Sequence, residues 1–208
     1  MVFRVRATAW LVLVLGAHAV AAQISPRFDF QGFVPAVPSE QGEAIELLAI
    51  LYDGGTRPAP IHVDFARAQH TVVLRAKLDA TSGFTQSYGT ATLAIYADVG
   101  PQTPADYTQP STFADGELVL TGVFVGALRR DQGAAARGSF LGNVTWTAGS
   151  RRGELGRNTS HWSFGGAINA TPYRVPFGFS ERWEGLIGQM VVAVESPTWG
   201  AVKALYLR

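Results

Sequence analysis

Two carboxylates lie close together in the stretch PFGFSERWEGLIG at positions 176–188. Glu181 and Glu184 are three residues apart and are flanked by aromatic residues and by Arg182. A glycosidase uses a pair of carboxylates that converge on one bond. Side chains of a β-strand alternate between its two faces, so residues three apart point in opposite directions. On a regular strand, Glu181 and Glu184 therefore cannot act as such a pair.

Glu181 is the unusual member of the two, because strand alternation puts it on the same face as Phe179 and Trp183. Burial there would raise the pKa of the carboxyl group or require a partner such as an arginine or a hydroxyl, and such burial is how an acid catalyst is prepared. The simpler interpretation, which we take first, is that Ser180 and Glu181 form a turn or bulge and that the carboxylate faces water.

Histidines offer a second source of chemistry, and beyond residue 22 the chain has only His62, His70 and His161. They lack the HxH and HExxH spacings of metal sites, so we predict no metal and no cofactor. His161 is the best catalytic candidate of the three because it precedes Trp162 and follows the turn-rich sequence RRGELGRNTS. No Gly-x-Ser-x-Gly sequence suggests a nucleophilic serine.

Two Asp-Gly sequences could donate oxygen ligands to calcium. They are YDGG, which contains Asp53, and FADGE, which contains Asp115 and Glu117. Neither has the alternating Asp/Asn pattern of a dedicated calcium loop, and Asp-Gly is foremost a turn signal. We therefore interpret both as turns.

The first residues have the three-part pattern of a secretory signal peptide. Arg4 and Arg6 precede an apolar run, and small residues follow it up to Ala22. We expect a leader at 1–22 that directs export to the periplasm or the extracellular space, followed by a single all-β domain at 23–208. Loss of the leader changes the formal net charge from +1 to about −1, so nucleic acid is not an expected partner.

The chain has no cysteine, which excludes disulfides, thiol catalysis and cysteine-ligated metals. All three of its asparagines, Asn143, Asn158 and Asn169, begin an Asn-x-Ser/Thr sequon and are candidate glycosylation sites. However, the absence of cysteine and the Ala/Arg-rich, Lys-poor composition are typical of an exported protein of a GC-rich bacterium. N-glycosylation is thus the second interpretation.

Short runs that alternate apolar and polar residues, separated by Gly, Pro, Asp and Ser clusters, predict strands joined by tight turns. The runs at 117–129 and 138–148 are predicted to pair as an antiparallel hairpin. VKALYLR at 202–208 is a further candidate strand. The side chains predicted to share an apolar face within each run are Val72, Leu74, Ala76 and Leu78; Leu118, Leu120, Phe124 and Leu128; Phe140, Val144 and Trp146; Trp162, Phe164 and Ile168; and Tyr173, Val175, Phe177, Phe179, Trp183 and Ile187.

One apolar segment fits two structures. In SEQGEAIELLAILYDGG at 39–55, Ala44, Leu47, Leu48 and Leu51 have helical spacing, with Ser39 as an N-cap, yet the same run could be a buried strand. The Pro-bearing segment 100–116 is predicted to be a long loop between two halves of one domain.

These patterns predict an all-β domain of roughly eight to ten antiparallel strands, either a sandwich or a closed barrel, with one short helix as an option. The leading function is a non-catalytic exported module that binds a glycan, a small apolar ligand or a surface component. One alternative is a carbohydrate-active hydrolase or lyase that uses Glu181 with His161 or Asp98. Another is a structural or assembly component, or an outer-membrane β-barrel.

Overall fold

The computed structural model describes residues 26–53, 59–99, 104–133 and 136–189. The predicted leader at 1–22 and the candidate strand at 202–208 lie outside these ranges. The described strands are β1 Arg27–Val34, β2 Ala44–Tyr52, β3 Ala68–Ser82, β4 Thr85–Val99, β5 Glu117–Phe124, β6 Leu128–Gln132, β7 Arg137–Ala148, β8 Trp162–Asn169 and β9 Glu181–Gln189. The described helices are three short 3-10 turns, η1 Pro110–Phe113, η2 Arg152–Leu155 and η3 Pro172–Arg174.

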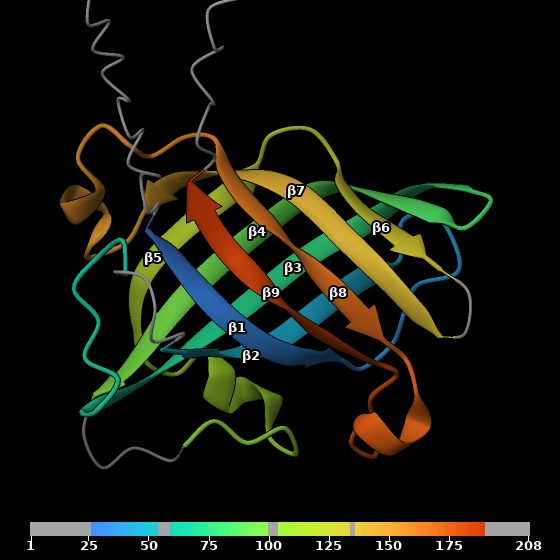
Figure 1. The fold of residues 1–208 in the computed structure, drawn as a ribbon, viewed down its shortest axis with the longest axis horizontal. Coiled ribbons are helices and arrows are strands. Elements are labelled where there is room, and N and C mark those ends of the chain that lie inside the picture. Colours follow the sequence, from blue (N-terminus) through green and yellow to red (C-terminus); the bar gives the residue numbers. More distant parts are fainter. Residues whose placement is uncertain (1–25, 54–58, 100–103, 134–135, 190–208) are drawn as a thin grey trace, which may run out of the picture.

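The strands form a closed antiparallel barrel, which decides between the two predicted all-β architectures (Figure 1). Strands β1 to β5 each pair with the next along the chain, as do β6 to β9, and β9 pairs with β1 over eight residue pairs, from Arg27–Gly188 to Val34–Glu181. Strands β5 and β6 both pair with β4 and with β7, so they follow one another along a single position. The barrel therefore has eight strand positions.

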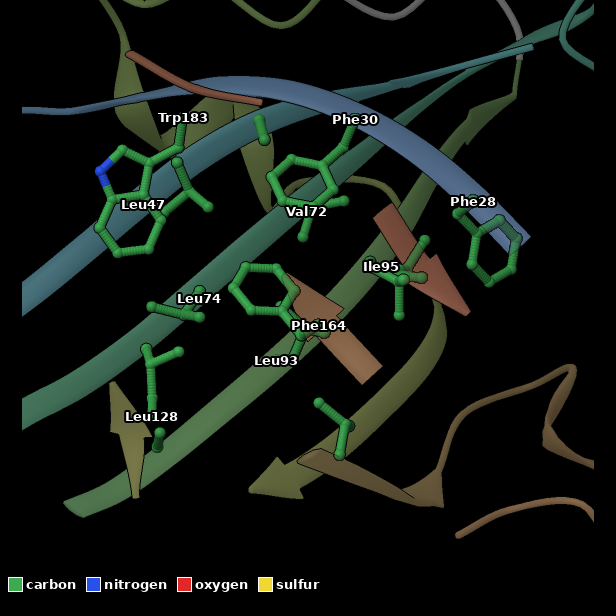
Figure 2. Packing of buried hydrophobic residues seen from close by; sticks show 14 of the residues in the cluster. Phe28, Phe30, Leu47, Val72, Leu74, Leu93, Ile95, Leu128, Phe164 and Trp183 are labelled. Atoms are coloured by element: carbon green, nitrogen blue, oxygen red, sulfur yellow. The ribbon is translucent and has the colours of Figure 1, made fainter. Parts of the chain in front are cut away.

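Side chains, chiefly apolar ones, fill the interior of the barrel (Figure 2). Phe30 and Phe164 stack with ring centroids 5.1 Å apart, and Phe140 stacks on Trp183 at 4.5 Å. The predicted inward faces of β3, β7 and β8 are confirmed, because all of their members are buried. Alternation with a period of two thus identified most of the core.

The two strands β8 and β9 approach closely where Gly166 pairs with Gly185. A Cβ atom on Gly166 would lie 2.1 Å from the carbonyl oxygen of Glu184, and one on Gly185 would lie 2.2 Å from that of Gly165. A larger residue at either position would push the strands apart.

The ambiguous segment is strand β2, so the helical alternative is wrong. Its inner residues, such as Leu47, are buried in the core, and its outer residue Leu48 is buried too. Burial on both faces requires a continuous apolar run, and such a run also satisfies helical spacing. Ser39 begins a turn in which its own N–H and that of Glu40 donate to the Glu43 carboxylate at 2.8 and 2.9 Å. These bonds lower the pKa of Glu43.

The predicted strand from Tyr173 to Ile187 is correct only from Glu181 onward. Pro172 and Pro176 lack backbone donors, and Gly178 has a φ of +88°, so the preceding residues form turns. Phe177 is consequently fully exposed rather than in the core.

The predicted pairing of the run at 117–129 with β7 is confirmed, but its predicted face is partly wrong. A register shift lies between Ile95–Leu120 and Tyr96–Leu118 in the pairing of β4 with β5. The extra residue is Val119, which is buried together with Leu120, while Leu118 is exposed. Such a bulge interrupts strict alternation.

Residues 104–116, which we call the outer flap, pack against the outside of the barrel. Figure 1 shows them as yellow-green turns below β2. Phe113 is buried with Leu48 and Val73, and its carbonyl oxygen accepts a hydrogen bond of 2.7 Å from the hydroxyl of Thr71. The predicted long loop therefore covers the outer faces of β2 and β3 instead of only connecting two halves.

Among the described residues, no helix is long and apolar enough to cross a membrane.

The packing of the interior makes a testable contrast between two phenylalanines. Phe164→Ala should lower the free energy of unfolding by about 3–5 kcal/mol, because the ring is buried against Phe30 and Phe140. Phe177→Ala, at a side chain with a relative exposure of 105%, should change it by less than about 0.5 kcal/mol. Denaturant unfolding followed by tryptophan fluorescence measures both. Equal costs would contradict the assignment of the core.

Candidate functional site

Glu181 begins β9 on the inner face of the barrel and is only 3% exposed. The strand extends to this residue because both the N–H and the hydroxyl of Ser180 donate to the carbonyl oxygen of Val34, at 2.9 and 3.1 Å. The expectation that the carboxylate faces water is therefore wrong. Glu184, by contrast, is exposed, so the two glutamates do lie on opposite faces.

The partner of Glu181 is Arg130 of β6. The guanidinium group donates from Nε to Oε2 at 3.1 Å and from Nη2 to Oε1, which makes a bidentate pair. The indole N–H of Trp183 donates to Oε2 at 2.9 Å. Each carboxylate oxygen thus accepts at least one hydrogen bond inside the protein.

The pair belongs to a larger network at this end of the barrel. Arg130 Nη1 and the hydroxyl of Tyr88 both donate to Gln86 Oε1 at 2.9 Å, and Gln86 Nε2 donates to the carbonyl oxygen of Pro38 at 2.8 Å. Burial raises the pKa of Tyr88. We call these residues the barrel-end network: Gln86, Tyr88, Arg130, Glu181 and Trp183. It binds strands β4, β6 and β9 to the loop after β1.

Sequence reasoning missed Arg130, although a signal was present. Leu128 and Arg130 are two residues apart, so they share a face of β6, and Leu128 is buried. A charged residue in phase with a core leucine requires a buried counter-charge. Glu181, in phase with Trp183, is the matching residue.

The structure does not bring Glu181 together with His161 or Asp98. Trp162 pairs with Gln189, whereas Asn169 pairs with Arg182, so His161 lies at the opposite end of the β8–β9 pair from Glu181. Seven residues of strand separate the two ends, which is about 23 Å. His161 is exposed, and Asp98 lies near the end of β4 that is also remote from Glu181.

That opposite end is closed by the segment 59–67. Ile61 is buried against the core, and Val63 and Phe65 pack on it. Arg151 donates to the carbonyl oxygen of His62 at 3.0 Å, and the His62 N–H donates to the Glu154 carboxylate at 2.7 Å. A depression of about 200 Å³ remains at this end, lined by His62, Asp64, Arg67, Ala68, His70, Ala97, Glu117 and Arg151.

His70 points into this end of the barrel, because it shares the inner face of β3 with Val72 and Leu74. It is 4% exposed, its Nδ1 lies 3.2 Å from the carbonyl oxygen of Ala68, and its ring meets that of Phe65 edge to face at 5.5 Å. Burial is the main reason that its pKa is lowered. Within the described ranges, no cluster of three or more His, Asp or Glu residues could hold a metal.

A groove on the outside of the barrel brings together aromatic and amide side chains. It measures about 260 Å³, and we call it the outer groove; it is lined by Gln31, Phe33, Ile50, Tyr52 and Tyr107. Tyr52 is 47% exposed, although its side chain is large and mostly apolar. Tyr107 belongs to the outer flap and is held by ring contacts of 4.9 Å with Phe33 and 4.8 Å with Phe113. The flap and β1 thus form two walls of the groove.

Charged side chains surround this groove. Arg182 Nη2 donates to Gln31 Oε1 at 3.0 Å and to the Glu184 carboxylate at 2.6 Å. Because the amide oxygen of Gln31 is engaged by Arg182, its NH₂ group is oriented away and can donate to a ligand. Burial, followed by the charges of Asp29 and Glu184, raises the pKa of Tyr52. Tyr52 thus keeps its phenol proton and can also donate.

A second depression of about 490 Å³ lies on the other side of Tyr52. Its lining residues come from the ends of β2 and β3 and from the segment between them: Leu51, Tyr52, Asp53, Phe65, Ala66, Arg67, Ala68, Gln69 and His70. Tyr52 therefore separates two hollows of the surface.

The sequon asparagines occupy different environments. Asn143, on the outer face of β7, and Asn158, between η2 and β8, are exposed. Asn169 is half-buried, and its side-chain oxygen accepts the N–H of Thr171 at 2.9 Å. The amides of Asn143 and Asn158 are the accessible ones.

Comparison of the chain with protein-family models, with curated proteins and with solved structures found no match. The structure itself defines the class of protein, a closed eight-position antiparallel β-barrel with a filled interior and an aromatic groove on its outer face.

The barrel-end network makes a prediction about stability. Arg130→Met and Glu181→Gln should each lower the free energy of unfolding by about 3–5 kcal/mol, because each leaves the other member buried without its partner. The double variant Arg130→Met/Glu181→Leu should cost less than the sum of the two single changes. Denaturant unfolding of the three variants measures these costs. Strictly additive costs would show that the two side chains do not interact.

The burial of His70 predicts a pH dependence. Its pKa in the folded protein lies below the ordinary value of 6.5, so the unfolded chain takes up this proton more readily. The free energy of unfolding should therefore fall as the pH decreases through 6.5 toward the folded-state pKa. His70→Phe should flatten the curve between about pH 7 and pH 5. Unfolding at a series of pH values tests this, and an unchanged slope in the variant would contradict it.

Proposed function

We propose that this protein is an exported, non-catalytic β-barrel module that binds a glycan in the outer groove. The observation that carries the proposal is the position of Tyr52 and Tyr107 in one groove beside the amide of Gln31. An aromatic ring that is half exposed in a groove offers an apolar face together with a polar tip. A sugar ring presents the complementary surface, with C–H groups on its face and hydroxyls at its edge.

The polar groups around the groove match hydroxyl groups. The NH₂ group of Gln31 and the hydroxyls of Tyr52 and Tyr107 are donors, while the carboxylates of Asp29 and Glu184 are acceptors. The charges of Arg182 and Glu184 compensate one another. A neutral glycan fits this arrangement better than a strongly charged one.

The size of the groove fits a small unit. At about 260 Å³ it falls just below the range of about 300–1,000 Å³ typical of sites for drug-sized molecules. One sugar ring on Tyr52 is of this scale. The depression on the other side of Tyr52 gives a longer chain a place to continue.

The interior supports a surface site over an internal one. The barrel is filled by stacked aromatic rings, and the Glu181 carboxylate is bound by Arg130 and Trp183. An acid or base catalyst must reach the proton that it transfers. The engagement of Glu181 therefore favours a binding role over the hydrolase alternative. Export follows from the leader expected at 1–22.

The outer groove predicts the effect of one aromatic substitution. The protein should be retarded in native gels that contain a soluble neutral polysaccharide, with a β-glucan, a xylan and a mannan as the probes. Tyr52→Ala should weaken this retardation at least about tenfold, because the stacking surface is lost. Phe177→Ala removes a fully exposed ring outside the groove and should have no effect. The absence of retardation with every probe, or equal binding by Tyr52→Ala, would contradict the proposal.

A further inference from the structure

Asp98 is a buried carboxylate to which no described residue donates a hydrogen bond. It lies on β4 next to the start of the segment that leads into the outer flap, and it is 6% exposed. Neither of its carboxylate oxygens is accessible to solvent, and neither accepts a hydrogen bond from the described residues. An ionised carboxylate in such a position is strongly unfavourable unless a cation compensates it.

The surroundings of Asp98 add negative charge and oxygen atoms instead of positive charge. Its Oδ1 faces Gly116, where a Cβ atom would lie only 2.2 Å away, so Asp98 packs directly against the residue that follows Asp115 at the end of the flap. Burial, and then the charge of Asp115, raise the pKa of Asp98. Within the described ranges, no ion pair joins Asp98 or Asp115 to a lysine or an arginine.

A third oxygen comes from the neighbouring strand. Gln69 of β3 is the cross-strand partner of Asp98, and its Oε1 already accepts the N–H of Ala105 at 2.7 Å. An amide oxygen has a second lone pair that can bind a cation. Strands β3 and β4 and the end of the flap therefore each carry an oxygen-bearing side chain at neighbouring positions of the fold.

We propose that Asp98, Asp115 and Gln69 form a calcium site at the base of the outer flap. Calcium takes carboxylate and amide oxygens in a flexible geometry and completes its shell with water, whereas magnesium requires a nearly ideal octahedron. Two carboxylates balance the charge of the ion. This small number of ligands matches the weak sites of extracellular modules, with dissociation constants of about 0.1–1 mM.

The site would join the two ends of the flap. Asp98 precedes the flap, Asp115 lies at its end, and Ala105 is already held by Gln69. Calcium would therefore hold the segment that carries Tyr107 against the barrel. This inference stands on the contacts of Asp98 and does not depend on the ligand of the outer groove.

Thermal unfolding of the full protein in EDTA and in CaCl₂, at matched ionic strength, tests the site. The midpoint temperature should rise by about 3–6 °C at a calcium concentration tenfold above the dissociation constant. Asp98→Asn should abolish this rise. Asp106→Asn is the matched control, because Asp106 belongs to the same flap but accepts the N–H of Thr108 instead; it should keep the rise. MgCl₂ should give a smaller one.

Isothermal titration with CaCl₂ gives a second readout at a temperature where every variant is folded. Binding by the wild type and by Asp106→Asn, but not by Asp98→Asn, supports the site. An absence of any calcium effect on the wild type would overturn it. An equal calcium effect in the wild type and in Asp98→Asn would also overturn the site. A third contrary outcome is that Asp98→Asn stabilises the protein by the same amount with and without calcium, because this would identify Asp98 as a protonated carboxyl group.

Discussion

The pairing of β9 with β1 is the constraint on which the other features depend. It joins residues more than 140 positions apart and converts a meander of strands into a closed barrel. Closure gives each strand position two neighbours and defines an inside and an outside. It also brings Glu181 of β9 into the interior, where it meets Arg130, and it places Gln31 of β1 beside Arg182 on the exterior. Both the barrel-end network and the outer groove therefore follow from one strand pair.

The interior of the eight-position barrel is filled by side chains. A barrel of this size has an interior just wide enough to be filled by side chains or to hold one small ligand. Here Phe30, Phe140, Phe164 and Trp183 supply rings that reach across it. The depressions described above accordingly lie on the outer surface and at the end opposite the barrel-end network. The two ends differ in chemistry. One is held together by the ion pair and hydrogen bonds of the barrel-end network, and the other is closed by the apolar side chains of Ile61, Val63 and Phe65.

Local periodicity predicted the inner faces of β3, β7 and β8 because side-chain alternation is a property of a strand by itself. What depended on distant residues was not predictable in the same way. Leu48 is buried because Phe113 packs on it, and the Glu181 carboxylate is buried as the partner of Arg130, which lies 51 residues earlier. The turns before Glu181 reflect Pro172, Pro176 and Gly178, whose effects outweighed an apparently regular alternation. The outer groove was not predicted at residue level because it requires β1, β2 and the flap to be assembled.

The outer flap contributes Tyr107 to the groove without being a strand of the barrel. Its contacts with the barrel are made by side chains and by a few hydrogen bonds, such as that from Thr71 to Phe113. Loops on a rigid scaffold tolerate changes in length and sequence better than the strands that carry them. One wall of the groove can therefore be rebuilt by substitution or insertion while the opposite wall on β1 stays fixed. Such a division separates the part of the groove that can vary from the part that closure of the barrel fixes.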